Sequence, residues 1–267
     1  MNAPQPAPLL LSAQKGAVLR LSLNRPAARN ALNSALMGAL AEALEAAATN
    51  TNVWVVIIAA EGGTYSAGHD LKEMTACRTE TDKGAAAFSD LFSQCSALMQ
   101  QIVALPKPVI AEVQGTATAA GCQLVASCDL AVASEAARFA TPGVDIGLFC
   151  STPMVALSRN IGRKKAMEML LTGEMVSAEE AHALGLVNRV VTPEKLAAET
   201  LALAEKVAAK PRATVKTGKQ AFYRQLEMPL AEAYDYAARI MTENMLHAEA
   251  EEGICAFLEK REPKWPS

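Results

Sequence analysis

Two stretches of small residues could bring free backbone amides to one point in the folded chain. The first is Ser66-Ala67-Gly68-His69-Asp70-Leu71, after an apolar run at 53–60, and the second runs from Gly115 to Gln123, after an apolar run at 109–113. Each leads into the predicted first turn of a helix, where N–H groups lack intrahelical partners and the helix dipole is positive. Two such amides aimed at one point can stabilise an oxyanion. Either stretch alone is more typical of a tight turn, because glycine-rich turns are common.

Strand and helix patterns alternate over the first part of the chain and would position these stretches. Strands are predicted from apolar runs at 18–23, 53–58, 109–113 and 130–133. The β-branched run at 53–58 is typical of a parallel strand that is covered on both faces. Apolar residues recur every three or four positions at 36–44 and 88–102, which predicts amphipathic helices.

The pattern becomes mainly helical after residue 152. Ser177 and Glu180 have capping-box spacing, Thr192-Pro193 predicts another helix start, and a short strand is expected at 186–191 between them. The sequence therefore predicts an α/β core over residues 1–200 and a C-terminal helical region for oligomer contacts over residues 201–267. A doubly wound dinucleotide-binding fold is the competing α/β interpretation, but no GxGxxG motif follows a strand.

Composition excludes several classes of partner. The net charge of −3 argues against nucleic-acid binding and against attachment to anionic lipid. The six cysteines form no CxxC pair and only three histidines are present, so we expect free thiols in a reducing compartment and no metal site. No segment has the roughly 18 consecutive apolar residues of a membrane span. The N-terminal MNAPQPAPLLLSAQKG lacks the features of a signal or transit peptide. These observations predict a soluble, cytoplasmic protein.

The two candidate stretches also show a family resemblance. Residues 66–74 resemble the first oxyanion segment of the enoyl-CoA hydratase/isomerase, or crotonase, family, and residues 115–130 resemble the second. Further matches occur in the family's order over nearly the whole chain, at 23–26, 30–33, 171–174, 181–187 and 256–265. The stretch 139–153 resembles the subgroup called enoyl-CoA hydratase domain-containing protein 3.

This resemblance implies a fold, an assembly and a ligand. The fold would be the crotonase-like (ClpP/crotonase) spiral of β-β-α turns, with C-terminal helices that form a homotrimer or a hexamer built as a dimer of trimers. The ligand would be an acyl-CoA thioester whose carbonyl oxygen binds the N–H groups of His69 and Ala120. Because coenzyme A is part of the substrate, no separate cofactor is expected.

The resemblance also implies a set of coenzyme A-binding residues. The matched positions are Arg25, Arg29, Ala67, Asp70, Leu71, Lys72, Gly121, Phe257 and Lys260. Phe257 and Lys260 match positions that reach the ligand of a neighbouring subunit. Each basic residue of the set could equally belong to a solvated surface.

The sequence departs from the family at both positions of its acid–base pair. Family members that hydrate enoyl-CoA use two glutamates that share a water, and the matching positions here are Gln123 and Gly143. Glutamine can orient a water but cannot accept its proton, and glycine has no side chain. Replacement candidates are Asp145, Ser151 and the His69 side chain. A histidine at position 69 resembles the family's methylmalonyl-CoA decarboxylase. The alternatives are a turn residue at 145, a helix cap at 151 and a surface imidazole at 69.

Three functions remain open from the sequence. The leading one is an acyl-CoA-processing enzyme of the hydratase or isomerase type that stabilises a thioester enolate. An acyl-CoA decarboxylase is an alternative, because loss of CO₂ creates the enolate without a strong base. A non-catalytic acyl-CoA-binding protein is the other. The missing carboxylates weaken the first interpretation and are compatible with the other two.

Hydration of a simple 2-enoyl-CoA should be far slower here than in a relative with both glutamates. Positioned acid and base groups each contribute roughly 10²- to 10⁴-fold, and Gln123 and Gly143 supply neither. The absorbance of crotonyl-CoA measures the rate. A variant with Gln123→Glu and Gly143→Glu together should be faster than wild type if the site has room for both carboxylates. Wild-type turnover at the rate of an efficient relative would reveal another base, with Asp145→Asn as the first variant to make.

Overall fold

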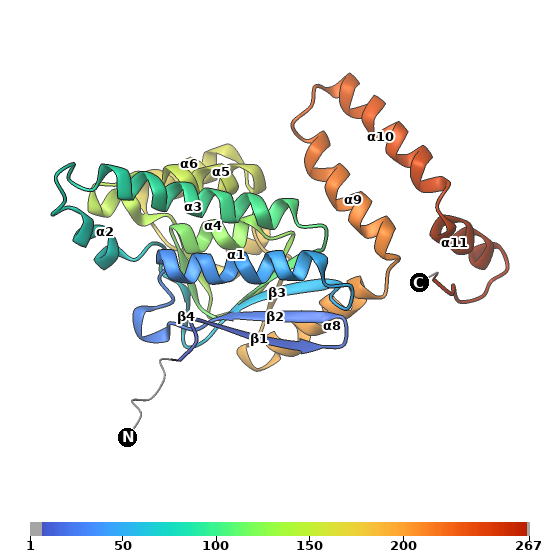
Figure 1. The fold of residues 1–267 in the computed structure, drawn as a ribbon, viewed down its shortest axis with the longest axis horizontal. Coiled ribbons are helices and arrows are strands. Elements are labelled where there is room, and N and C mark those ends of the chain that lie inside the picture. Colours follow the sequence, from blue (N-terminus) through green and yellow to red (C-terminus); the bar gives the residue numbers. More distant parts are fainter. Residues whose placement is uncertain (1–6, 266–267) are drawn as a thin grey trace.

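Two β-sheets form the centre of the computed structural model, which describes residues 7–265 (Figure 1). The larger sheet has the strand order β1-β2-β3-β5-β7-β10 and the smaller has the order β4-β6-β8-β9. The pairs β1–β2 and β8–β9 are antiparallel, and the other neighbouring strands are parallel. The strand bounds are β1 Leu10–Lys15, β2 Val18–Leu23, β3 Val55–Ala60, β4 Thr64–Ser66, β5 Val109–Val113, β6 Thr116–Thr118, β7 Leu130–Ser134, β8 Arg138–Ala140, β9 Val176–Ser177 and β10 Arg189–Val191.

Successive strands of the chain alternate between the two sheets. Strands β3, β5 and β7 lie in the larger sheet, and each is followed at once by β4, β6 or β8 of the smaller sheet. Helices follow each pair: α2 (Leu71–Cys77) and α3 (Ala85–Ala104), then α4 (Ala120–Ser127), then α5 (Ser151–Asn160). This repeat confirms the predicted spiral of β-β-α turns.

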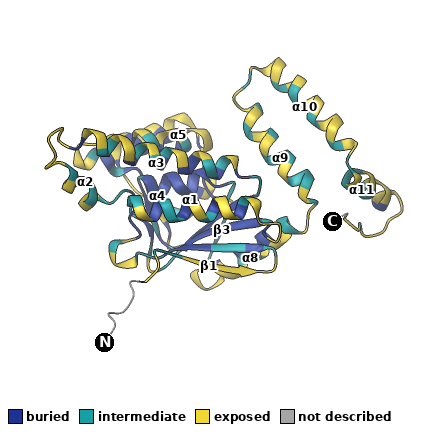
Figure 2. Cartoon of the chain, viewed as in Figure 1, coloured by how far each residue is buried: buried dark blue, intermediate teal, exposed yellow. Residues whose placement is uncertain are grey.

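The central strands of the larger sheet are buried on both faces, as the apolar run at 53–58 predicts, whereas the edge strand β1 is mainly exposed. Alternate residues of a strand face opposite sides, and Val56 and Ile58 belong to the main core with α1 (Ser34–Thr49), α3 and α4. Val55 and Ile57 pack on the other face with Leu203 of α8 (Leu196–Ala208). Figure 2 shows β3 as mainly buried and β1 as mainly exposed, beside helices that are partly exposed. The β-branched run is therefore explained by contacts on both sides.

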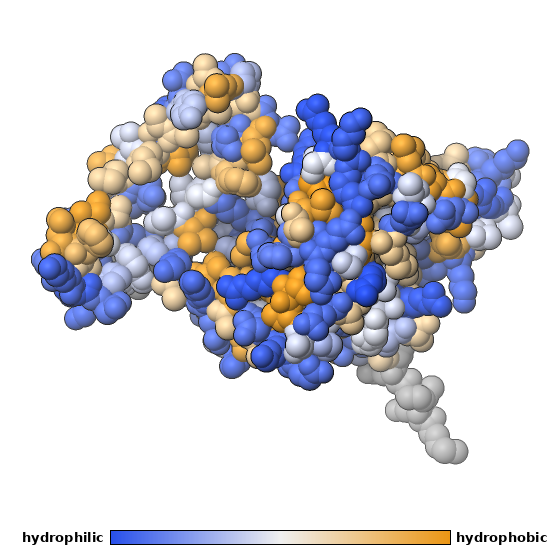
Figure 3. All heavy atoms as spheres, turned by 180° about the vertical axis from the view of Figure 1, so that it is seen from behind, coloured by the Kyte–Doolittle hydropathy of each residue, from blue (hydrophilic) through white to orange (hydrophobic). Residues whose placement is uncertain are grey.

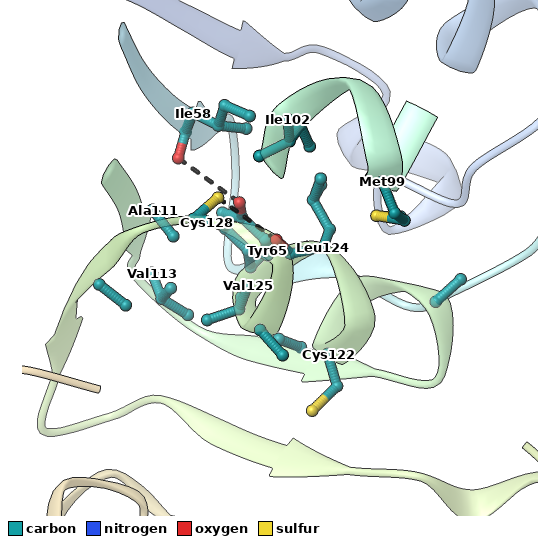
Figure 4. Packing of buried hydrophobic residues seen from close by; sticks show 14 of the residues in the cluster. Ile58, Tyr65, Met99, Ile102, Ala111, Val113, Cys122, Leu124, Val125 and Cys128 are labelled. Carbon is teal, nitrogen blue, oxygen red and sulfur yellow. Dashed lines mark hydrogen bonds between the residues drawn. The ribbon is translucent and has the colours of Figure 1, made fainter. Parts of the chain in front are cut away.

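Helix α4 lies at the centre of the main core. All eight of its residues are buried. Cys122, Leu124 and Val125 belong to the same packed cluster as Tyr65, whose hydroxyl donates to the Ile58 carbonyl at 3.5 Å (Figure 4). Because a close-packed core resists displacement, the position of the N-terminal turn of α4 is fixed.

The remaining elements are helical. The α-helices are α6 Arg163–Thr172, α7 Ala178–Ala183, α9 Arg212–Gln225, α10 Leu230–Met245 and α11 Ala248–Leu258, and the 3-10 helices are η1 Pro26–Ala28, η2 Pro142–Ile146 and η3 Pro193–Lys195. The start predicted at Thr192-Pro193 is present as η3, which leads directly into α8. Among the helices of residues 7–265, none has the length and apolar character to cross a membrane.

Helices α9, α10 and α11 form an arm that extends away from the sheets (Figure 1). In these helices Ala256 is the one residue that is buried in the described chain. The division predicted at residue 200 falls inside α8, which packs on the larger sheet, and the arm begins at Arg212.

A largely buried ion pair connects α9 to the segment before β7 of the larger sheet. Lys219 Nζ lies 2.7 Å from Asp129 Oδ2 and also donates to the carbonyls of Ile102 and Lys107. The Tyr223 hydroxyl donates to Asp129 Oδ1 at 2.9 Å. Burial lowers the pKa of Lys219, against the opposing effect of the Asp129 carboxylate. Loss of either charge would leave the other buried and uncompensated, so this group fixes the direction in which the arm leaves the core.

Candidate active site

The loop before α1 holds the first candidate stretch in place. Asn30 is fully buried, and its side-chain amide donates to the Glu61 carbonyl at 2.8 Å. The Ser66 hydroxyl donates to the Asn30 carbonyl at 2.9 Å, and the Ala67 N–H donates to the Arg29 carbonyl at 3.0 Å. These bonds join the turn after β3 and the start of the stretch to a single loop.

The backbone of His69 faces away from this loop. Leu32 donates its N–H to the Gly68 carbonyl at 2.7 Å and accepts the N–H of Asp70 at 3.2 Å. These two bonds flank His69 in a parallel bridge, so the N–H and C=O of His69 point to the opposite side. Within residues 7–265 the His69 N–H has no protein acceptor.

The N-terminal turn of α4 packs directly against this stretch. A Cβ added at Gly121 would lie 2.3 Å from the Ser66 carbonyl oxygen. One added at Gly68 would lie 3.3 Å from the Ala120 nitrogen. The two candidate amide segments are therefore in backbone contact.

The residue before α4 has a strained backbone. Ala119 has φ 48° and ψ −119°, a combination that L-residues rarely adopt, and its N–H donates to the Ala140 carbonyl at 2.9 Å. As the first residue of α4, Ala120 has no intrahelical acceptor for its N–H, and the described chain provides no other. Strain of this kind is concentrated at functional sites.

The His69 ring is enclosed beside Phe92. The two ring centres are 5.3 Å apart in an edge-to-face arrangement with 73° between the planes. Both ring nitrogens are inaccessible to solvent and have no hydrogen-bond partner in the described structure. Burial lowers the pKa of His69, against the smaller opposing effects of the Leu32 backbone and the Glu73 carboxylate. The ring is therefore mainly neutral at pH 7, and it is not the surface imidazole that the sequence left open.

The two positions matched to the family's glutamates lie in closed surroundings. Gln123 is 4% exposed, one turn into α4, and its Oε1 has a long contact of 4.0 Å with Cys95 Sγ. A Cβ added at Gly143 would lie 2.5 Å from the Leu148 carbonyl oxygen and 2.9 Å from Cys150 Sγ. A glutamate at 143 would therefore require the segment 148–150 to move. The variant that combines Gln123→Glu and Gly143→Glu therefore lacks space for its second carboxylate.

Asp145 and Ser151 have local contacts. Asp145 is exposed, and its Oδ2 would lie 2.8 Å from a Cβ at Gly173, at the C-terminal end of α6. Ser151 is exposed at the start of α5, and its hydroxyl donates to the Phe149 carbonyl at 3.3 Å. In the described chain neither side chain has a hydrogen bond to Gln123.

The basic residues near α2 differ in the charges around them. Arg25 forms an ion pair with Asp70 at 2.9 Å. Although partial burial acts to raise it, the hydrogen bonds from Arg25 and from two backbone amides hold the pKa of the Asp70 carboxyl below its usual value. Arg29 and Lys72 are exposed and form no ion pair within residues 7–265, and Leu71 beside them is 50% exposed. The charges of Arg29 and Lys72 are therefore available to bind an anion.

Phe257 and Lys260 lie at the far end of the arm. Phe257 is 82% exposed, and Lys260 is also exposed. Figure 1 shows α11 and α2 at opposite ends of the molecule. One chain therefore does not bring these residues to Lys72, and a role at the ligand of another subunit stays a prediction.

Comparison with known proteins assigns the family. The enoyl-CoA hydratase/isomerase family model matches residues 13–267. The chain belongs to this family. A protein of Xenopus laevis named mitochondrial enoyl-CoA hydratase domain-containing protein 3 is 46% identical to it, over 98% of this chain and 87% of that protein. A protein of Danio rerio with the same name is 48% identical, over 96% of this chain and 87% of that protein. These relatives confirm the resemblance to that subgroup.

Solved structures of the enoyl-CoA hydratase/isomerase family share this fold. An enoyl-CoA hydratase of Mycobacterium smegmatis is 54% identical and has a TM-score of 0.92, with 97% of this chain and 99% of that one covered. Human enoyl-CoA hydratase domain-containing protein 3 is 44% identical and has a TM-score of 0.91, with 97% and 100% covered. The predicted crotonase-like fold is confirmed.

The expectation of a cytoplasmic family member is contradicted by these relatives. The frog, mouse and human proteins are all named as mitochondrial. The expectation depended on bulk composition and on the lack of targeting features in one short segment. Composition is a poor guide to the compartment because a targeting segment is separate from the packed domain. The core and surface of the domain do not encode a compartment.

Sequence reasoning missed three features of this family member's site. These are the strain at Ala119, the segment 148–150 beside Gly143, and the buried Thr141 hydroxyl, which has no partner among the described residues. An alanine gives no indication of a positive φ. The Thr141 and Gly143 surroundings depend on contacts between distant segments.

Ala119→Gly should stabilise the folded protein by about 1 kcal/mol, because glycine adopts a positive φ without the steric cost of a Cβ. Urea denaturation measures the change. The same substitution at Ala198, which is exposed inside α8, should instead destabilise by about 1 kcal/mol. Equal losses at both positions would contradict strain at Ala119.

Proposed function

We propose that this protein binds an acyl-CoA thioester and stabilises its enolate with the N–H groups of His69 and Ala120. The observation that supports this most is the backbone contact between Gly68 and Ala120, together with two amides that lack protein acceptors. A thioester oxygen about 3 Å from both nitrogens would accept two hydrogen bonds. Because the enolate oxygen carries more negative charge than the thioester oxygen, the amides would favour the enolate.

The proposed chemistry differs from ordinary hydration. Adding water across a double bond needs a group that takes a proton from water and a group that delivers one to Cα. Gln123 cannot take the proton, and the Leu148 carbonyl and Cys150 thiol occupy the space beside Gly143. The activity we expect is therefore exchange at Cα, in which water takes the Cα proton, the electron pair passes to the thioester oxygen, and water then returns a proton to Cα, with slow hydration at most.

Decarboxylation of an acyl-CoA that carries a carboxylate on Cα is a second candidate. The closed space beside Gly143 favours it, because this reaction needs no protein base to form the enolate. The bond between Cα and the carboxylate breaks, CO₂ leaves, and the electron pair passes to the thioester oxygen. Water or a neighbouring group then protonates Cα.

Coenzyme A binding would use the cations that remain available. Arg29 and Lys72 are exposed without an ion pair in the described chain, whereas the charge of Arg25 is matched by Asp70. Phosphate contacts at such an exposed position should weaken as salt concentration rises. Lys260 and Phe257 would complete the site only from another subunit.

Gly68→Ala should slow exchange of the Cα protons of butyryl-CoA by about 10²-fold or more, the magnitude typical of losing one oxyanion donor. Gly68 has φ +89°, and an added Cβ would lie 2.9 Å from the Ala119 Cβ and 3.1 Å from the Thr118 carbonyl oxygen. The two amides would have to separate. Deuterium incorporation from D₂O, followed by mass spectrometry, measures the exchange.

Gly16→Ala is the matched control. Gly16 also has a positive φ, +57°, but it lies in the turn between β1 and β2 with nothing within 4 Å of the added Cβ. This variant should keep wild-type exchange. Unchanged exchange in Gly68→Ala would contradict the proposed role of the amides. Binding without any exchange by wild type, together with no decarboxylation, would establish a binding protein.

We also propose that the arm assembles the chain into a homotrimer or a pair of trimers. Leu230, Tyr234 and Met241 of α10, and Leu246 at its C-terminal cap, are between 66% and 83% exposed. Figure 3 shows apolar residues on the surface of the arm. Exposed apolar surface of this kind marks protein contacts. Light scattering should give three or six times the chain mass of 28.2 kDa, and a monodisperse monomer at micromolar concentration would contradict the assembly.

A further inference from the structure

A cavity of about 320 Å³ lies between the larger sheet and the base of the arm. Its walls come from the C-terminal end of α1, the residues before β3 and β5, the end of α8, and the first turns of α9 with the segment before them. Trp54 is one of the lining residues, and the charged ones are Lys107, Lys210, Arg212 and Lys216. We refer to this cavity as the basic pocket.

The four cations of the basic pocket have no carboxylate partner. No Asp or Glu is among its lining residues, and none of the ion pairs within residues 7–265 includes any of the four. Burial and the nearby charge of Arg212 lower the pKa of Lys107. The charged side chains that line the basic pocket are therefore all positive, although the whole chain has a net charge of −3. The Glu249 carboxylate is outside the lining and accepts the N–H groups of Ala213 and Thr214.

Two of the cations have contacts that also serve the fold. Lys107 Nζ donates to the carbonyls of Ala47 and Asn50, and a cation there complements the negative end of the α1 dipole. The Arg212 guanidinium lies 3.4 Å from the centre of the Trp54 ring. Stacking holds this planar group in one orientation.

Folding does not account for the other two cations. Lys210 and Lys216 are exposed, and their ammonium groups have no hydrogen bond within the described chain. They nevertheless line the same cavity as Lys107 and Arg212. Holding like charges around one cavity raises the energy of the empty protein, which a bound anion would relieve.

We propose that the basic pocket binds a small anion that bears a phosphate group. Phosphate oxygens accept several charge-assisted hydrogen bonds at once, and arginine is suited to bind two of them side by side. Arg212 stacks on Trp54 and donates from Nη1 to the Thr51 carbonyl at 3.0 Å, and its other N–H groups would supply such a pair. Lys210 and Lys216 would supply mobile charges at the entrance.

The basic pocket is separate from the proposed acyl-CoA site. It lies at the N-terminal ends of the parallel strands β3 and β5, beside Trp54 and Pro108. His69 follows β4 and Ala120 follows β6, the strands of the smaller sheet that come next after β3 and β5 in the chain. The basic pocket therefore has no lining residue in common with the proposed acyl-CoA site, and separate variants can test the two sites.

Equilibrium dialysis with radiolabelled pyrophosphate tests the proposal on the full-length protein. We expect saturable binding that weakens as sodium chloride rises, and a Kd that increases about tenfold, which corresponds to about 1.4 kcal/mol, when Lys210→Gln and Lys216→Gln are combined. Lys206→Gln is the matched control, because Lys206 is exposed on α8 but does not line the basic pocket. It should keep the wild-type Kd.

Tryptophan fluorescence tests whether the anion binds in the basic pocket, beside Trp54. The chain has two tryptophans, so Trp265→Phe leaves Trp54 as the single reporter beside Arg212. Its emission should change with the same Kd as dialysis. Absence of saturable pyrophosphate binding, or equal binding by the double variant, would overturn the proposal.

Acyl-CoA binding separates this proposal from the proposed function. Calorimetry with butyryl-CoA should give the same affinity for wild type and for the double variant. A parallel loss of butyryl-CoA and pyrophosphate affinity would assign the basic pocket to the coenzyme A site and overturn it as a separate site. Pyrophosphate binding without butyryl-CoA binding would contradict the proposed function alone.

Discussion

The close backbone approach between successive turns of the spiral is the constraint on which the site depends. A Cβ at Gly115 would lie 2.1 Å from the Gly63 carbonyl oxygen, and one at Gly121 would lie 2.3 Å from that of Ser66. No side chain fits either gap, so glycine at these two positions lets the second turn pack directly on the first. Helix α4 is wholly buried and cannot retreat from this contact. The amides of His69 and Ala120 therefore belong to two backbone segments that are in contact.

The acid–base chemistry of the proposed site is limited by packing as well as by residue type. At Gln123 the side chain is present but cannot accept a proton. At Gly143 the Leu148 carbonyl and the Cys150 thiol lie where a side chain would begin. A carboxylate cannot be restored at 143 by substitution alone, because the backbone of 148–150 would have to move. The reactions that suit such a site generate the enolate with little help from a protein base.

The base of the arm combines a neutralised pair and a set of unpaired cations. Lys219 and Asp129 form the buried pair, and the Lys107 carbonyl accepts a hydrogen bond from Lys219. The Lys107 ammonium belongs to the basic pocket and caps α1. The anchor of the arm and the basic pocket therefore share one residue. The direction of the arm and the shape of the basic pocket depend on the same few contacts.

The sequence by itself determined the elements in which apolar residues recur at a regular spacing. The apolar run at 53–58 predicted a strand covered on both faces, and the small-residue stretches at 66–71 and 115–123 predicted two loop-to-helix junctions. Family motifs predicted the spiral. Three-residue strands such as β4 and β6 were not predicted, because so short a segment has no readable periodicity and is a strand only through its neighbours.

Only the tertiary structure decided how these junctions meet and what surrounds them. The positive φ of Ala119, the enclosure of His69 by Phe92 and the obstruction at Gly143 each depend on contacts between residues far apart in the sequence. The four cations of the basic pocket come from two separate segments, at 107 and at 210–216. Sequence spacing specifies which side of a helix or strand a residue occupies. It does not specify which distant residue lies opposite, because that is set by the packing of the whole chain.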